Sequence, residues 1–226
     1  AAMGGKDELR FDGLAESWDH DVPAFNTLAV ECIAAPDAAL LPRVPGLADA
    51  LFQSDGTMTK QEVRAATLAK LMPMRGALLW DIGCGSGSVA IEWMRAARYA
   101  RAIGIEPRAD RRAMAGANAL ALGAPKLELV DGTVPAALDG LPAPDAIFIG
   151  GGLSLQTFEA AWAALRPLGR LVANAVTLES EAVLMELHAK YGGDLVRISV
   201  CRAEPVGRLT GWRPAMPVTQ WSLVKR

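Results

Sequence analysis

The residues with the clearest chemical potential are three glycines at alternate positions, Gly83, Gly85 and Gly87. Because glycine has no Cβ, it lets the backbone turn sharply and lets a ligand approach the main chain closely. Asp81 opens the loop, and Glu106 follows the glycines by about 20 residues, where nucleotide-binding α/β folds place a carboxylate against ribose hydroxyls. A carboxylate there accepts two hydrogen bonds from a vicinal diol and repels a 2′-phosphate. The pattern predicts a site for a nucleoside-like cofactor.

The spacing of the loop narrows the choice of cofactor. Dinucleotide-binding folds favour G-x-G-x-x-G, whereas residues 81–87 read D-x-G-x-G-x-G. This form resembles the first motif of the S-adenosylmethionine-dependent methyltransferases. The resemblance implies that the loop carries the methionine end of the cofactor and that Asp81 helps to hold its amino group. For the loop taken alone, a turn with purely structural duties remains the alternative.

Hydrophobic periodicity places this loop in a chain of alternating strands and helices. The apolar run 78–82 is typical of a strand covered on both faces. Further strands are expected at 101–106, 126–130, 145–149, 169–176, 195–202 and 217–225, and helices at 57–72, 107–122, about 155–165 and 178–191. This order predicts an α/β fold: the seven-stranded, Rossmann-like sheet of S-adenosylmethionine-dependent methyltransferases, ending in an antiparallel hairpin with an insertion at 204–216.

Three other segments lie where the expected strands meet this loop. Thr59 has capping-box spacing with Glu62, and the helix that it starts is expected to lie against the cofactor loop. The turn 132–134 can present backbone groups to an adenine ring, although a plain turn fits nearly as well. The triplet Gly150–Gly152 at a strand end implies that something approaches the backbone closely.

Composition bounds the class of protein. The chain has 226 residues and a formal net charge of −2, which provides no global basic field for nucleic acid. Its three cysteines are widely spaced and predict neither a disulfide framework nor a metal site, which fits a reducing compartment. No apolar run reaches the roughly 18 residues that a membrane span needs, and no leader pattern opens the chain. We therefore expect a cytoplasmic protein that binds neither membrane nor nucleic acid.

The first 50 residues differ in character from the rest. Residues 23–34 read as one strand, and Pro36, Pro42, Pro45 and Gly46 follow with linker composition. The strand is expected to pair with a sheet edge or a neighbouring subunit. It is either an embellishment of the main domain or the last strand of an absent upstream domain. We divide the chain at 1–50, a linker with a residual strand, and 51–226, the methyltransferase domain.

Several segments together resemble one family, the cobalamin-biosynthesis methyltransferases that act on precorrin-6B. They are MTKQEVRA (58–65), DIGCGSGSVAIE (81–92), GIEP (104–107), DGTVPAAL (131–138), IFIGGG (147–152) and ANAVTLES (173–180). The resemblance implies methylation of carbon 15 of a precorrin with S-adenosyl-L-methionine and decarboxylation of an acetate side chain. It also implies a homotetramer or homodimer, and fusion in many organisms behind a domain that methylates carbon 5, which this chain would lack.

The resemblance and the loop positions together give the candidate cofactor contacts. They are Thr59, Asp81, Gly83, Cys84, Gly85, Ser86, Gly87, Glu106, Gly132, Thr133, Val134 and Gly150. Thr133 departs from the family, which usually has Asp there, so only backbone contacts are expected from this residue.

Substrate and catalytic candidates are fewer. Cationic residues suit a substrate with many carboxylates, and the candidates for substrate binding are Gly151, Gly152, Arg202, Arg208 and Arg213. Asn174 and Glu179 flank the end of the expected fifth strand and are the catalytic candidates, with Glu179 as the candidate acid or base.

Four other functions use the same features. They are another small-molecule methyltransferase, a nicotinamide-dependent oxidoreductase on the same fold, a nucleic-acid methyltransferase and a regulatory S-adenosylmethionine-binding module. The glycine spacing and Gly150–Gly152 argue against the oxidoreductase, and the absence of a basic stripe argues against nucleic acid.

Overall fold

The computed structural model describes residues 1–2, 4–38 and 40–226, which divide into two units, 1–40 and 41–226. The first unit has one short 3₁₀ helix, η1 (Ala15–Ser17), and is mostly exposed. The strand expected at 23–34 is wrong, because these residues form no strand and Phe25 and Ile33 are 72% and 87% exposed. Ala2 N–H donates to Phe25 C=O at 2.9 Å, but no ladder of such bonds follows in the described part of this unit. Apolar side chains alone make no strand without a neighbouring strand to pair with.

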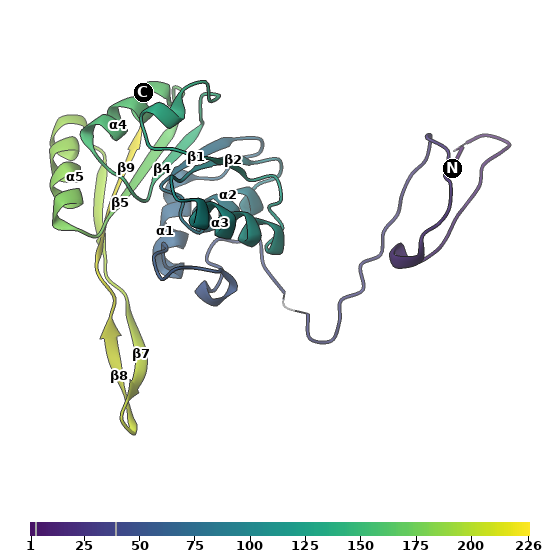
Figure 1. Ribbon diagram of the computed structural model, residues 1–226, viewed down its shortest axis with the longest axis horizontal. Helices are drawn as coiled ribbons and strands as arrows, with labels where there is room; N and C mark the ends of the chain where they lie inside the picture. Colours follow the sequence, from purple (N-terminus) through teal and green to yellow (C-terminus); the bar gives the residue numbers. More distant parts are fainter. Residues whose placement is uncertain (3, 39) are drawn as a thin grey trace. The chain divides into compact units, whose positions relative to one another are not determined.

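The second unit is built on a seven-stranded sheet with the order β3-β2-β1-β4-β5-β9-β6 (Figure 1). Only β9 runs antiparallel to its neighbours, β5 and β6. The strands of this sheet are β1 (Leu78–Ile82), β2 (Arg101–Ile105), β3 (Glu128–Val130), β4 (Ala146–Ile149), β5 (Arg170–Ala175), β6 (Asp194–Ile198) and β9 (Val218–Val224). The predicted fold is confirmed, including the antiparallel last strand.

Helices cover both faces of the sheet, so its central strands are buried throughout. They are α1 (Gln61–Leu71), α2 (Ser88–Ala96), α3 (Ala109–Ala121), α4 (Leu155–Ala164) and α5 (Leu178–Tyr191), with short 3₁₀ helices η2 (Asp49–Leu51) and η3 (Ala136–Leu138). Trp80 packs in the core with α4 and α5, whereas its neighbour Leu79 packs with α1 and α2. This alternation turns Asp81 toward α1 and α2, the side on which the cofactor loop continues.

The start of α1 differs from the sequence prediction. The helix begins at Gln61, its cap residue is Lys60, and no side chain caps it, so the predicted capping box of Thr59 and Glu62 is wrong. Thr59 lies one residue before the cap, and its carbonyl accepts a hydrogen bond from Arg64 (2.6 Å). This arrangement leaves the Thr59 side chain free of a capping role.

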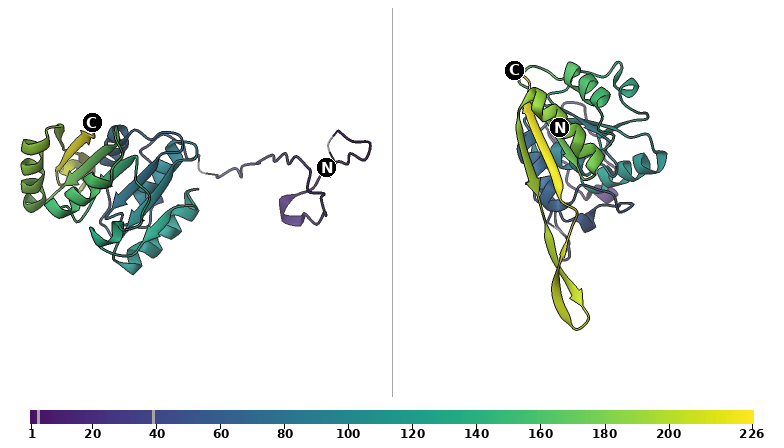
Figure 2. Two further views of the ribbon diagram at one scale, coloured as in Figure 1. Left: turned by 90° about the horizontal axis from the view of Figure 1, so that it is seen from above. Right: turned by 90° about the vertical axis from the view of Figure 1, so that its left-hand side faces the viewer.

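The end of the chain is more divided than the sequence suggests. The single strand expected at 195–202 is two strands, β6 and β7 (Cys201–Val206), and β7 pairs only with β8 (Leu209–Pro214). The resulting two-stranded arm extends away from the sheet (Figures 1 and 2). Three large apolar side chains on it, Val206, Leu209 and Trp212, are at least 65% exposed.

None of the helices among the described residues is long and apolar enough to cross a membrane. No group of three or more His, Cys, Asp or Glu side chains in the same residues is placed to hold a metal ion.

Candidate active site

A cavity of about 390 Å³ opens where the loops after β1, β2, β3 and β4 meet. The carboxyl ends of parallel strands are the place where α/β sheets bind ligands, and the cavity lies at the point where the strand order reverses, between β1 and β4. Of the predicted cofactor residues, all but Gly87 line the cavity, and so do Gly151 and Gly152, which were predicted for the substrate. The structure therefore brings nearly the whole predicted set together around one space.

Two of the loop glycines are required by the atoms packed around them. Gly83 has φ +70°, and a Cβ there would lie 2.8–2.9 Å from backbone atoms of Gly151. The close approach predicted from Gly150–Gly152 is thus at least partly the approach of the cofactor loop itself. Gly87 also has a positive φ, and a Cβ there would lie 3.1 Å from the Ala115 Cβ in α3. Helix packing accounts for Gly87, whose predicted role in binding stays a prediction.

Glu106 stands at the end of β2 with its carboxylate held in place by main-chain donors. One oxygen accepts from Gly85 N–H (3.1 Å) and the other from Arg108 N–H (3.1 Å), and the side chain is buried. A carboxylate offers about four lone-pair sites, so two remain for further donors. The side chain lines the cavity, and its free lone pairs suit the two hydroxyls of a ribose.

Asp81 lies at the other side of the glycine loop and is only 1% exposed. Its Oδ2 accepts from Ala90 N–H in the first turn of α2 (3.0 Å), whereas its buried Oδ1 has no hydrogen-bond partner among the described residues. Burial raises the pKa of Asp81 to about 7, and the nearby Glu106 charge acts in the same direction. A buried carboxylate oxygen that lines a cavity and lacks a partner is suited to a cationic donor.

Cys84 has a packing role in the loop. Its side chain lies over Gly104 in β2, where a Cβ would come within 2.8 Å of its sulfur. Burial raises the pKa of the Cys84 thiol, so the thiolate form is disfavoured and nucleophilic chemistry is not expected of it.

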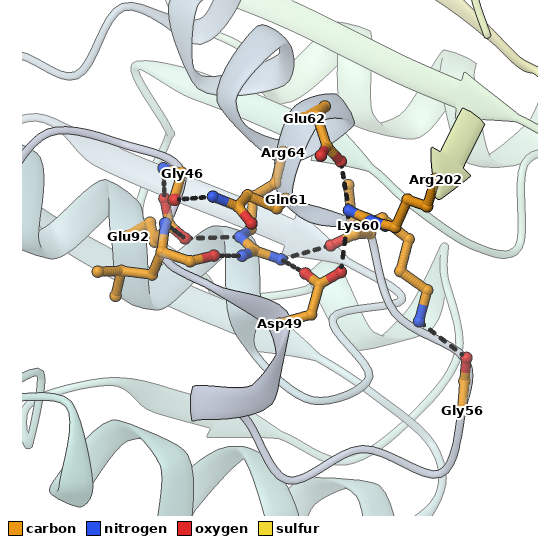
Figure 3. A network of polar contacts seen from close by, with 11 residues as sticks. Gly46, Asp49, Gly56, Lys60, Gln61, Glu62, Arg64, Glu92 and Arg202 are labelled. Carbon is orange, nitrogen blue, oxygen red and sulfur yellow. Dashed lines mark hydrogen bonds and ion pairs between the residues drawn. The ribbon is translucent and has the colours of Figure 1, made fainter. Parts of the chain in front are cut away.

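A buried arginine that was missed from the sequence fixes one wall of the cavity. Arg64 in α1 is fully buried, pairs with Glu92 in α2 (2.6 Å), and donates to the carbonyls of Leu47 and Thr59 (Figure 3). Glu92 in turn accepts from two backbone N–H groups of the segment that leads to η2, those of residues 46 and 47. The network ties residues 46–59 to α1 and α2, and so positions Thr57–Thr59 at the cavity. The sequence signal that could have identified Arg64 is its place, as a charged residue, within the apolar stripe of the helix expected at 57–72.

A smaller cavity of about 110 Å³ lies beside the first and shares Thr59 and Gly150 with it. Asn174 and Arg202 line it, together with apolar side chains from β6, β9 and α1. The Asn174 amide donates to Thr67 Oγ1 and accepts from Gln220 Nε2, both at 3.0 Å, so its orientation is fixed.

The remaining substrate and catalytic candidates lie elsewhere. Arg208 is at the turn of the β7–β8 arm, and Arg213 pairs with Glu204 on the same arm (3.0 Å). Glu179 is exposed in the first turn of α5, and it is not among the residues that line either cavity. Their predicted roles stay predictions.

Comparison with known proteins identifies the family. Residues 50–225 match the profile described as "precorrin methyltransferase domain". The chain belongs to this family. A protein of Sinorhizobium sp. named precorrin-6Y C(5,15)-methyltransferase (decarboxylating) is 56% identical over 205 residues, which are 90% of this chain and 50% of that protein. The chain thus spans about half the length of the curated relative, and the resemblance to this family seen in the sequence is confirmed.

Shorter relatives match over nearly their whole length. A protein of Pyrobaculum calidifontis named probable cobalt-precorrin-6B C(15)-methyltransferase (decarboxylating) is 36% identical over 181 residues, 77% of this chain and 93% of that protein. The crystal structure of the C-terminal domain of precorrin-6Y C5,15-methyltransferase from Rhodobacter capsulatus superposes with a TM-score of 0.77 at 51% identity, covering 82% of this chain and 100% of that one. The precorrin methyltransferase domain seen here therefore corresponds to the C-terminal domain of the longer relatives.

Proposed function

We propose that this precorrin methyltransferase domain uses S-adenosyl-L-methionine to methylate carbon 15 of a precorrin of the 6B type, and removes the carboxyl group of an acetate side chain. The observation that carries the proposal is the pair of buried carboxylates across one cavity: Asp81 with an unpartnered oxygen, and Glu106 with free lone pairs. A cationic amine and a ribose diol on one ligand satisfy both.

The residues fit this cofactor at each of its parts. Asp81 Oδ1 would accept from the ammonium group and Glu106 from the ribose hydroxyls, while the turn 132–134 borders the same cavity for the adenine. The glycine loop is anchored next to Glu106, because the N–H groups of Gly83 and Cys84 both donate to Ile105 C=O (2.9 and 3.2 Å). The bound cofactor supplies an activated methyl group on a sulfonium.

The remaining work of the protein in methyl transfer is alignment. Displacement at a sulfonium requires the attacking carbon, the methyl carbon and the sulfur in line, with water excluded. Gly150, which borders both cavities, marks the place where the two reactants would meet. An electron-rich tetrapyrrole carbon makes a strong base unnecessary.

Decarboxylation needs an electron sink and one proton. The bond between the acetate methylene and its carboxyl carbon breaks, the electron pair passes into the protonated conjugated ring, carbon dioxide leaves, and a proton converts the methylene into a methyl group. Asn174 and Glu179 are the proposed candidates to assist this step. Full decarboxylation by a Glu179→Gln variant would remove that residue from consideration.

Mass spectrometry of the product tests the function directly. Incubation of the chain with the tetrapyrrole and cofactor should add one methyl group and remove carbon dioxide. Addition of a methyl group alone would confine this chain to transfer, and an unchanged mass in the presence of bound cofactor would favour a regulatory binding module.

Equilibrium binding separates the proposed cofactor from a nicotinamide dinucleotide. S-adenosylhomocysteine should bind and NAD should not. Glu106→Ala removes two charge-assisted hydrogen bonds to the ribose and should weaken S-adenosylhomocysteine binding on the order of 100-fold. Glu128→Ala, an exposed acid at the start of β3, is the matched control and should leave binding unchanged. Equal affinities for wild type and Glu106→Ala would contradict the proposed ribose contact.

We also propose the assembly and the missing partner. The β7–β8 arm, with its exposed apolar side chains, is the proposed contact in a homotetramer or homodimer. A domain that methylates carbon 5 is the proposed neighbour upstream, which residues 1–50 would join as a linker. The cytoplasmic location stays a prediction.

A further inference from the structure

Four cationic side chains line the two cavities, and three of them are already paired with carboxylates. The three are arginines: Arg108 with Asp110 (2.5 Å) and Asp55 (3.7 Å), Arg111 with Asp55 (2.7 Å), and Arg202 with Glu62 (2.6 Å) and Asp49 (3.7 Å). Their charges are largely neutralised by the protein itself, so a carboxylate ligand would compete with existing ion pairs for each of them.

Lys60 is the fourth, and it differs from the others. Among the residues that the structure describes, no carboxylate lies within ion-pair distance of its ammonium group, and its contact is with Gly56 C=O at 3.4 Å. Figure 3 shows the Lys60 ammonium directed toward Gly56, while the neighbouring Arg202 guanidinium lies between Glu62 and Asp49. Lys60 therefore carries an uncompensated positive charge at the edge of the smaller cavity.

The position of Lys60 indicates what its charge is for. It follows Thr59, which borders both cavities, and it lines the smaller cavity together with apolar side chains such as Val63 and Ile198. A ligand with an apolar body and a peripheral carboxylate fits such a wall, because the body covers the apolar side chains while the carboxylate meets the ammonium.

We propose that Lys60 binds a carboxylate of the tetrapyrrole substrate and so sets one edge of the ring at the smaller cavity, facing the methyl donor in the larger one. This assignment deepens the proposed function and rests on it for the identity of the ring. Arg202, which was predicted from the sequence to bind substrate, pairs with Glu62 at the start of α1, and its predicted role stays a prediction.

Binding of a stable polycarboxylate tetrapyrrole tests Lys60 without relying on turnover. The probe is uroporphyrin, which carries eight carboxylates, followed by its fluorescence at low and high salt. Lys60→Gln should bind it about tenfold more weakly than wild type at low salt, the loss expected for one charge-assisted hydrogen bond, and should show a shallower salt dependence. Lys60→Arg should keep most of the affinity. Lys126→Gln, an exposed lysine at the far edge of the sheet, is the matched control and should match wild type.

Other measurements separate this assignment from the proposed function. All variants should bind S-adenosylhomocysteine equally, and in turnover Lys60→Gln should raise KM for the tetrapyrrole with little change in kcat. Equal uroporphyrin binding by wild type and Lys60→Gln, or no binding by either, would overturn the role of Lys60. A tenfold Lys60 effect on binding, in a chain that never methylates a precorrin, would keep Lys60 and overturn the function.

Discussion

At the scale of single residues, Asp81 carries the most specific expectation, because burial makes its charge costly. Burial raises its pKa to about 7, while a cationic amine beside Oδ1 would stabilise the carboxylate and lower that pKa. Cofactor binding should therefore release a proton when the pH is below about 7. We predict that the affinity for S-adenosylhomocysteine is greatest near pH 8 and falls by up to tenfold per pH unit below about 7. Titration calorimetry in buffers of different ionisation enthalpy measures both effects.

The Asp81→Asn variant tests whether Asp81 causes this pH dependence of the affinity. It should bind more weakly at pH 8 and lose the pH dependence. Because the pKa of Asp81 in the folded chain lies above its ordinary value of 3.8, the folded state holds more protons than the unfolded state between about pH 4 and 7. The free energy of unfolding of the wild type therefore falls as the pH rises through this window, and the stability of Asp81→Asn relative to it should rise. A pH-dependent affinity that survives in the variant would point to another group.

Whether a site residue could be predicted from the sequence depended on whether its position is set by local spacing or by the fold. Asp81 and Glu106 were found from the sequence because their spacing from the glycines is set by a local strand–loop–helix unit, and both line the cavity. Gly87 has the same spacing signal but is accounted for by a contact with α3, which the sequence does not reveal. Lys60 was not selected, because its interest depends on the partners that the neighbouring arginines find elsewhere in the fold.

At the scale of elements, two glycine variants test the close contact between the loops after β1 and β4. Gly83→Ala would place a Cβ 2.8 Å from Gly151 at a positive φ, whereas a Cβ at Gly151 would lie 3.8 Å from Gly83. We predict that Gly83→Ala lowers the free energy of unfolding by at least about 2 kcal/mol and impairs S-adenosylhomocysteine binding, while Gly151→Ala leaves stability nearly unchanged. Chemical denaturation of both variants measures the difference. Equal stability of the two would mean that the loops are further apart than described.

The buried Arg64 network gives the second expectation at this scale. Arg64→Met would leave Glu92 buried and without its cationic partner, and should cost about 3 kcal/mol of stability. Arg43→Met, a change at an exposed arginine whose guanidinium donates to one carbonyl, is the control and should cost far less. Adding Glu92→Gln to Arg64→Met should recover part of the loss, since no buried charge is then left. Denaturant unfolding of the three variants provides the test.

Element boundaries show where sequence patterns fail. The helix at 178–191 was predicted with its observed bounds, because Thr177 caps one end and Gly192 closes the other. The expected start of α1 was wrong, because the helix begins at Gln61 with Lys60 as its cap residue, while the Thr59 carbonyl accepts from the buried Arg64. A strand was expected at 23–34 from its apolar residues, but strand formation depends on pairing with another strand, which a local pattern cannot supply.

At the scale of the whole molecule, the β7–β8 arm is the feature that a monomer does not explain. A two-stranded hairpin is marginal in water by itself, and this one exposes Trp212 at 76%. We predict that the chain sediments as a dimer or tetramer and that Trp212→Ser shifts it toward the monomer. Leu120→Ser, a change at an exposed apolar residue on α3, is the control and should leave the mass unchanged. A wild-type monomer at micromolar concentration would contradict the proposed contact.

The placement of β9 has a consequence for how the chain reaches its final shape. β6 pairs only with β9, although β9 follows β6, β7 and β8 along the chain. Until residues 218–224 have been synthesised, one edge of β5 lacks the strand that hydrogen-bonds to it, and β6 has no strand to pair with. The strands β1 to β4, which carry the loops of the larger cavity, can assemble earlier during synthesis. A nascent chain halted before β9 would therefore have the larger cavity already formed, whereas the smaller cavity, which Val218 of β9 lines, would still be incomplete.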